Sequence, residues 1–64
     1  MDGIVKFFNI EHEYGFIAGE DEKDYYFNYR DVIDGVILKA DDNVVFDESS
    51  NERGLRALNV KHVL

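Results

Sequence analysis

The chain has 64 residues and a mass of 7.4 kDa, and it contains neither cysteine nor proline. We expect one small domain, residues 1–64, whose core is stable without disulfides or thiolate-bound metal. Seven basic and fourteen acidic residues give a net charge of −7, which argues against a basic clamp for duplex DNA. No apolar run is longer than Val36–Leu38, far short of the about 20 residues that span a bilayer. We therefore expect a soluble, cytoplasmic protein without membrane contact.

Three short strands are predicted in the first half of the chain. They are Gly3–Phe8, Tyr14–Ala18 and Tyr25–Asn28, and all three are rich in β-branched or aromatic residues. The connecting segments 9–13 and 19–24 are short and polar, and glycine opens the second. The three strands are therefore predicted to form antiparallel hairpins in a meander.

The second half of the chain predicts two further strands. Residues 30–34 can form one helical or 3₁₀ turn, and residues 35–42 form a longer connection with apolar residues directed inward. A fourth strand is predicted at Asn43–Asp47, followed by a polar turn over residues 48–54. The fifth strand runs from about Leu55 to Val63.

The fold class follows from these five strands. In the fifth strand, alternation puts Leu58, Val60 and His62 on the same side as Arg56, which gives one mostly apolar face. Five short strands without proline predict an all-β protein, a five-stranded antiparallel OB-fold barrel, because closure removes exposed sheet edges. A five-stranded SH3-like barrel is the structural alternative.

Few side chains in this sequence could support catalysis or bind a metal. Ser49 and Ser50 lie in a predicted turn, with neither histidine close in sequence. The acidic segment 20–24 lacks the ligand spacing of an EF-hand loop, and His12 and His62 have no second ligand at a suitable spacing. We therefore expect a protein that is not an enzyme and that has no metal and no cofactor.

Aromatic residues are concentrated in the first 29 positions, and Phe46 is the only one beyond them. Tyr14 and Phe16 share one face of their strand and are predicted to point outward, because a barrel interior has little room for both rings. Asn28 is polar and shares a face with Tyr26, which marks that face as exposed. Exposed rings usually mark a binding surface, and bases of single-stranded nucleic acid stack on such rings. The alternative is that the rings only surround a small core.

Phe7 can join this outer cluster only if its strand is irregular. Val5 and Phe7 lie two residues apart, so a regular strand would send both side chains to the same face. If Val5 lies inside and Phe7 outside, the strand must bend or bulge between them.

Four segments of the chain resemble the bacterial cold-shock proteins, which are single cold-shock domains of similar length. Residues 3–9 resemble the family motif GxVKWFN, with Phe7 in place of tryptophan. The other three segments are His12–Ile17, similar to KGFGFI, Asp24–Tyr29, similar to DVFVHF, and Arg53–Val60, similar to RGPxAxNV. Their order and spacing make the resemblance much more specific than any one motif.

The resemblance implies an OB-fold barrel that binds single-stranded RNA or DNA with low sequence specificity by aromatic stacking. It also implies a role as RNA chaperone or transcription antiterminator in the stress response. The nucleic-acid-binding residues carried over by position are Lys6, Phe7, Asn9, His12, Tyr14, Phe16, Tyr26, Asn28 and Arg53. Lys6 and Arg53 would contact phosphates, with Arg53 at the rim.

The sequence departs from the family pattern within these motifs. Glu13 replaces a glycine and His12 a lysine, and both changes oppose binding of a polyanion. Phe7 replaces tryptophan and Asn28 replaces histidine, which reduces the stacking area. The departure at Glu13 favours an alternative, a degenerate domain that binds a protein partner or itself. An acidic mimic of nucleic acid is a third hypothesis. We expect a monomer rather than a dimer.

The net charge predicts how stability depends on salt. Acidic residues outnumber basic ones twofold in a small barrel, so the folded state carries net repulsion that added salt screens. The melting temperature is expected to rise from about 0.01 M to about 0.15 M ionic strength, as measured by circular dichroism. A melting temperature that falls or stays constant would mean that local ion pairs outweigh the net charge.

Overall fold

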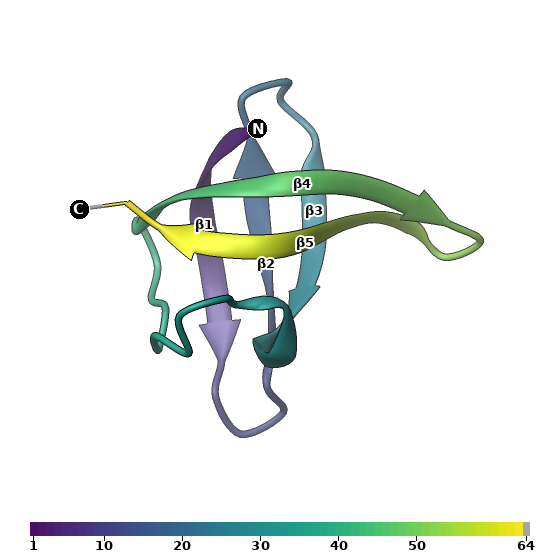
Figure 1. Cartoon of the computed structure of the whole chain (residues 1–64). Helices are drawn as coiled ribbons and strands as arrows, with labels where there is room; N and C mark the ends of the chain where they lie inside the picture. The colour runs from purple at the N-terminus through teal and green to yellow at the C-terminus, as the bar shows by residue number, and fades with distance from the viewer. Residues whose placement is uncertain (64) are drawn as a thin grey trace.

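The computed structural model describes residues 1–63, and within this range five strands form a closed barrel (Figure 1). The elements are β1 (Asp2–Asn9), β2 (Tyr14–Gly19), β3 (Asp24–Asn28), the 3₁₀ turn η1 (Tyr29–Asp31), β4 (Asn43–Asn51) and β5 (Gly54–His62). The strand order around the barrel is β1-β2-β3-β5-β4. The prediction of an all-β barrel of the OB type is confirmed. Leu64, the last residue of the predicted domain, lies outside the described residues, and no helix in residues 1–63 could cross a membrane.

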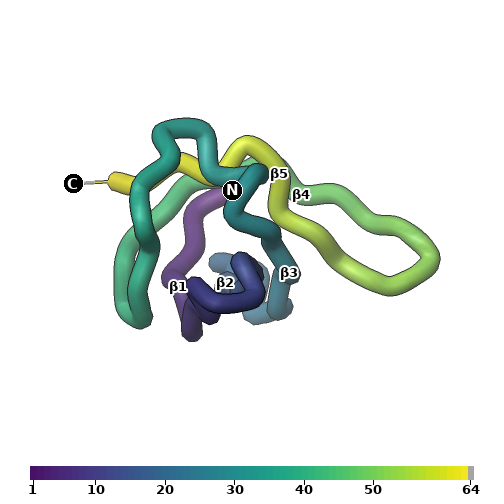
Figure 2. Tube along the Cα trace, turned by 90° about the horizontal axis from the view of Figure 1, so that it is seen from below, coloured from purple at the N-terminus to yellow at the C-terminus, as the bar shows by residue number. Residues whose placement is uncertain are grey.

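The strands pair as a meander closed by a hairpin. β2 pairs with β1 and with β3, and β4 pairs with β1 and with β5, all in antiparallel fashion. β3 and β5 close the barrel with a parallel contact, in which Tyr26 lies opposite Arg56. Figures 1 and 2 show that the β4–β5 hairpin extends beyond the barrel to one side. The outer face of β1, β2 and β3 is therefore left uncovered by this hairpin.

The barrel interior is filled by apolar side chains from every strand. Strand alternation sends one set of residues inward, and each buried large side chain stabilises the fold by about 1.5–3 kcal/mol. The buried set is Val5, Ile17, Tyr25, Phe27, Val32, Leu38, Val44, Phe46, Ala57 and Val60. Ile17 is fully buried, on the opposite face of β2 from Tyr14 and Phe16.

β1 carries the predicted irregularity. Its pairing with β2 shifts by one residue between Val5, which lies opposite Ile17, and Phe7, which lies opposite Phe16. Lys6 is the extra residue of this bulge. As a result Val5 is 1% exposed and Phe7 is 42% exposed, although they lie two residues apart. The bulge allows one strand to supply both the core and the outer face.

The turn predicted over residues 48–54 is wrong. β4 continues to Asn51 and β5 begins at Gly54, which leaves only Glu52 and Arg53 between the strands. The Oδ1 atom of Asn51 accepts a hydrogen bond of 2.8 Å from the backbone nitrogen of Arg53 and stabilises this short turn. The end of the hairpin lies outside the barrel, so its strands need no apolar alternation, and the sequence there is typical of a loop.

The apolar face predicted for the fifth strand is also wrong. The buried residues of β5 are Ala57 and Val60, which a regular strand would place on opposite faces, whereas Leu58 and His62 are only half-buried. Asn59 has a φ of 52°, and the β4–β5 register changes by one residue at this point. This second bulge reverses the alternation within the strand.

Tyr25 links the core to two acidic residues at the surface. Its ring is buried, and its hydroxyl donates to the Oδ2 atom of Asp21 at 2.6 Å and lies 3.0 Å from Oε2 of Glu48. The hydrogen bond from Tyr25 lowers the pKa of Asp21, and the same bond raises the pKa of the Tyr25 hydroxyl above its ordinary value. The phenol is therefore the donor and the carboxylate the acceptor at neutral pH.

This hydrogen bond predicts a pH-dependent difference in stability. Because the pKa of Asp21 is lower in the folded state, its contribution is present above its ordinary pKa of about 4 and is lost as the pH falls through the lowered value. Tyr25→Phe is therefore expected to be less stable than the parent near pH 7, with a smaller difference near pH 3. Urea unfolding at both pH values measures the two differences. Equal differences would show that the ionised Asp21 does not stabilise the fold through Tyr25.

Candidate nucleic-acid interface

Four aromatic rings form one continuous surface on the outside of the meander. We call Phe7, Tyr14, Phe16 and Tyr26 the aromatic surface. The centroid of Phe7 lies 5.8 Å from that of Tyr14 and 5.7 Å from that of Phe16. Tyr26 lies 6.0 Å from Tyr14 and 5.8 Å from Phe16 by the same measure. The structure thus brings together the rings that the sequence predicted to lie side by side.

The backbone register explains this arrangement. Phe16 of β2 lies between Phe7 of β1 and Tyr26 of β3 in the strand pairing. Gly15 points inward, where an added Cβ atom would lie 2.8 Å from the ring of the buried Phe27. Glycine therefore allows Phe27 to pack directly beneath β2, while the neighbouring rings remain on the outer face.

Lys6 projects from the β1 bulge and lies close to Asp24 of β3. Its Nζ atom is 3.0 Å from Oδ2 of Asp24, and both side chains are about half exposed. Exposed pairs of this kind contribute only about 0–1 kcal/mol, so a phosphate group can compete with Asp24 for the ammonium group. Lys6 thus reaches the strand that carries Tyr26, and it has a competing carboxylate there.

The predicted polar residues at the strand ends and in the β1–β2 loop hold the backbone around the aromatic surface. Oδ1 of Asn9 accepts from the backbone nitrogen of His12 at 3.1 Å, and the His12 side chain is exposed. Oδ1 of Asn28 accepts from the backbone nitrogen of Arg30 at 3.1 Å and caps η1. Asn28 also lies opposite Tyr14 in the β2–β3 pairing. Both asparagines therefore fix the ends of the strands that carry the rings.

The two arginines of the last motif lie in different places. Arg53 is exposed in the turn of the projecting hairpin. Arg56, which sequence reasoning did not include in the site, lies over the ring of Tyr26 with its Cζ atom 5.5 Å from the ring centroid. Its contact with Tyr26 depends on the parallel β3–β5 pairing, which no local sequence pattern indicates. Arg56 also occupies a variable position of the motif RGPxAxNV, so the resemblance gave no signal either.

Glu13 occupies a strained position at the edge of this surface. Its φ of 58° lies in the left-handed region, which favours glycine. Its carbonyl oxygen accepts a hydrogen bond of 2.8 Å from the backbone nitrogen of Tyr29, which holds the loop in place. The glutamate therefore adds both a negative charge and backbone strain where the family motif has glycine.

A small closed barrel of OB type with a continuous aromatic outer face is typical of nucleic-acid-binding proteins. The family model described as the "'Cold-shock' DNA-binding domain" matches residues 1–63, and the chain belongs to this family. The chain is 43% identical over 61 residues to "Cold shock protein 1" of Lactiplantibacillus plantarum, covering 92% of each protein. It is 37% identical over 62 residues to "Cold shock protein 2" of the same organism, covering 94% of each. The "Major cold shock protein" of Micrococcus luteus is 41% identical over 61 residues, covering 91% of each.

Family membership confirms the prediction made from the four motifs. The protein binds nucleic acid and has the chaperone-type function of the cold-shock family. The comparisons give no support to the alternative of a degenerate domain used only for protein interaction or self-association. The family is also a non-enzymatic one, in agreement with the absence of a predicted catalytic constellation.

The conformation of Glu13 predicts a change in stability. Glu13→Gly relieves the left-handed strain, which offsets the extra backbone entropy of glycine, so the free energy of unfolding is expected to rise by up to about 1 kcal/mol. Glu13→Gln is the matched control, because it removes the charge and keeps the strain. Denaturant unfolding of the parent and both variants measures the effect. A Glu13→Gly variant less stable than Glu13→Gln would contradict this account.

Proposed function

We propose that the protein binds single-stranded RNA and DNA with low sequence specificity by stacking bases on the aromatic surface. The observation that carries this proposal is the set of four neighbouring rings on one partly exposed face. Single strands leave their bases open to such rings, whereas a duplex keeps them stacked inside. The protein would hold RNA in unpaired form and so act as RNA chaperone or transcription antiterminator.

Stacking, rather than charge, supplies most of the affinity in this proposal. Each stacked base contributes about 1–3 kcal/mol, and every base has a face that can stack, so little sequence specificity results. Lys6 is the cation of the meander placed to meet a phosphate, and it must leave Asp24 to do so. Arg53 on the projecting hairpin would meet the phosphates of a longer strand. Glu13 opposes binding through its charge.

Three further proposals concern the polar residues near the rings, the oligomeric state and the location in the cell. Asn9 and Asn28 at the ends of β1 and β3, and His12 in the loop between β1 and β2, would contact the nucleic-acid strand beside the rings. The net charge of −7 produces repulsion between copies, which favours a monomer. We further propose that the protein works in the cytoplasm, where its RNA ligands are made.

Removing one ring tests the stacking mechanism. Phe16→Ala is expected to weaken binding of hexathymidine and hexauridine about fivefold to 150-fold, the loss of about 1–3 kcal/mol of base stacking. The fold should be retained, because Phe16 lies on the outer face. Tyrosine fluorescence quenching measures the affinity, and circular dichroism measures the fold.

Val63→Ala is the matched control for this experiment. Val63 is 43% exposed on the segment that follows β5, away from the aromatic surface, and its truncation should leave the affinity unchanged. Equal affinities for the parent and Phe16→Ala, with both proteins folded, would exclude stacking on this surface.

The salt dependence of binding tests the small electrostatic contribution. With one to three phosphates neutralised, the logarithm of affinity against the logarithm of salt concentration should have a slope of about −0.7 to −2. Titrations of hexathymidine over a range of sodium chloride concentrations give this slope. A slope steeper than about −4 would show that phosphate contacts dominate the affinity.

A further inference from the structure

Arg56 is a fixed hydrogen-bond donor at the border of the aromatic surface. We propose that Arg56 is a specificity-determining residue that recognises guanine in the nucleotide bound nearest to Tyr26. This inference rests on the proposed binding of single strands, and it adds a preference for guanine to an otherwise unspecific surface.

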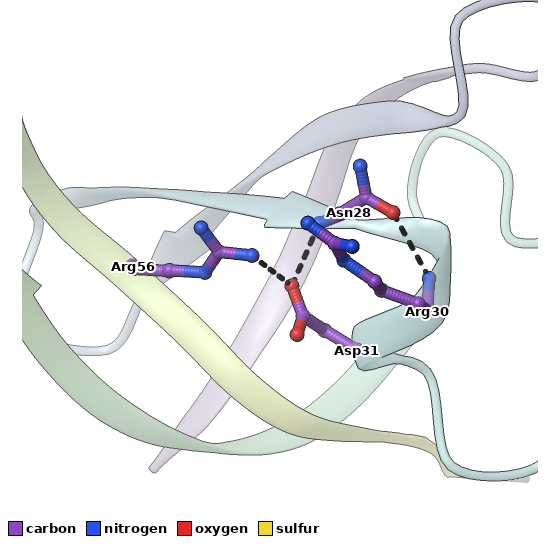
Figure 3. A network of polar contacts seen from close by, with 4 residues as sticks. All are labelled: Asn28, Arg30, Asp31 and Arg56. Atoms are coloured by element: carbon purple, nitrogen blue, oxygen red, sulfur yellow. Dashed lines mark hydrogen bonds and ion pairs between the residues drawn. The ribbon is translucent and has the colours of Figure 1, made fainter.

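Two contacts hold the guanidinium group in place. It lies over the Tyr26 ring, and its Nη2 atom is 3.0 Å from Oδ2 of Asp31. Figure 3 shows that Arg56 reaches this carboxylate from β5, whereas Asp31 belongs to η1. The side chain of Asp31 is 13% exposed, and the same Oδ2 atom accepts from the backbone nitrogen of Asn28 at 3.0 Å. The anchor of Arg56 is therefore itself fixed by the end of β3.

The chemistry of the guanidinium group selects the base. An arginine has five N–H donors on a rigid plane, and the ion pair with Asp31 engages only one of its nitrogen atoms. Guanine presents two adjacent acceptors, O6 and N7, which match two parallel N–H donors. Adenine replaces one of these acceptors with an amino group, and the pyrimidines lack N7. A guanidinium group held beside a stacked base therefore favours guanine.

The surroundings of Arg56 favour a base rather than a phosphate as its ligand. Arg56 lies over the Tyr26 ring at the border of the aromatic surface, so a base stacked on the neighbouring rings would bring its edge close to the guanidinium group. Asp31 partly neutralises its charge, which weakens attraction for phosphate and leaves the directional hydrogen bonds intact. Its side chain is 27% exposed, so part of the group is open to a ligand. Lys6, by contrast, is a flexible point charge of the kind that suits a phosphate.

The experiment uses hexathymidine and six derivatives, each with a single guanine at a different position. Tyrosine fluorescence titration should show about fivefold tighter binding for guanine at one position, the lower end of a bidentate arginine–guanine contact. At that position, inosine retains O6 and N7 and should keep the preference. Adenine, which stacks as a purine, and 7-deazaguanine, which lacks N7, should not.

Two variants connect the preference to Arg56. Arg56→Lys keeps the positive charge and loses the planar pair of donors, so the ratio of its affinities for the guanine derivative and for hexathymidine should fall to about one. Arg30→Lys is the matched control, because Arg30 is an exposed arginine of η1 to which no part in binding is assigned, and it should retain the ratio of the parent. Asp31→Asn keeps a carbonyl acceptor for Arg56 but removes the negative charge of the ion pair, so the guanidinium group is held less firmly. It should reduce the guanine-to-thymine affinity ratio without lowering hexathymidine affinity, which identifies Asp31 as a positioning residue.

The possible failures are distinguishable. If hexathymidine binds and no guanine position is preferred, the role of Arg56 is overturned and the proposed function stands. The same conclusion follows if 7-deazaguanine or adenine binds as tightly as guanine, or if folded Arg56→Lys keeps the preference. Should Arg56→Lys fail to fold by circular dichroism, an unchanged ratio in folded Asp31→Asn overturns the role. If neither hexathymidine nor any derivative binds, the proposed function fails with it.

Discussion

The register change in β1 between Val5 and Phe7 determines how both faces of the barrel are built. In a regular strand these two side chains would share a face, and either the core would lose Val5 or the outer surface would lose Phe7. Because Lys6 is an extra residue, Val5 packs opposite Ile17 while Phe7 lies beside Phe16. The same bulge directs Lys6 across the meander toward Asp24. Because of this one extra residue, β1 places Val5 in the core, Phe7 on the aromatic surface and Lys6 close to Asp24.

The electrostatics of the surface explain how an acidic chain can bind a polyanion. Both cations placed near the aromatic surface face a carboxylate, Lys6 that of Asp24 and Arg56 that of Asp31. With both cations paired and the negative charge of Glu13 at the edge, the surface has no strong basic field, and in the proposed binding mode the rings provide the affinity. The two pairs differ in burial, however. The exposed pair of Lys6 can exchange for a phosphate, whereas the half-buried pair of Arg56 is suited to hold a fixed donor.

The first half of the fold could be predicted from the sequence because its aromatic and apolar residues alternate strongly. That pattern located the strands, the outward rings of Tyr14 and Phe16, and the bulge before Phe7. The pattern was misleading where the β4–β5 hairpin extends beyond the barrel. The polar end of β4 has a sequence typical of a turn, but it pairs with β5 as a strand.

Two further features of the second half of the chain could not be predicted, because local sequence patterns do not determine them. The bulge at Asn59 reverses the alternation of inward and outward side chains in β5. The pattern of apolar residues in the sequence does not indicate this reversal. The position of Arg56 beside Tyr26 depends on a parallel contact between strands that are far apart in the sequence. Such contacts are set by closure of the whole barrel rather than by local propensity. The part of the candidate site that lies on the hairpins of β1, β2 and β3 was therefore predictable. The part that β5 contributes, Arg56, was not.

The most direct test of the central claim is to map the bound strand on the protein by NMR. Two-dimensional spectra of the ¹⁵N-labelled chain, recorded with increasing hexathymidine, report which backbone amides change their environment. The account predicts that the largest shifts occur at Phe7, Tyr14, Phe16 and Tyr26, and that residues 48–52 of the projecting hairpin change little. Shifts concentrated on that hairpin, with the four ring-bearing residues unchanged, would contradict the claim that stacking on the outer face of β1, β2 and β3 binds the strand.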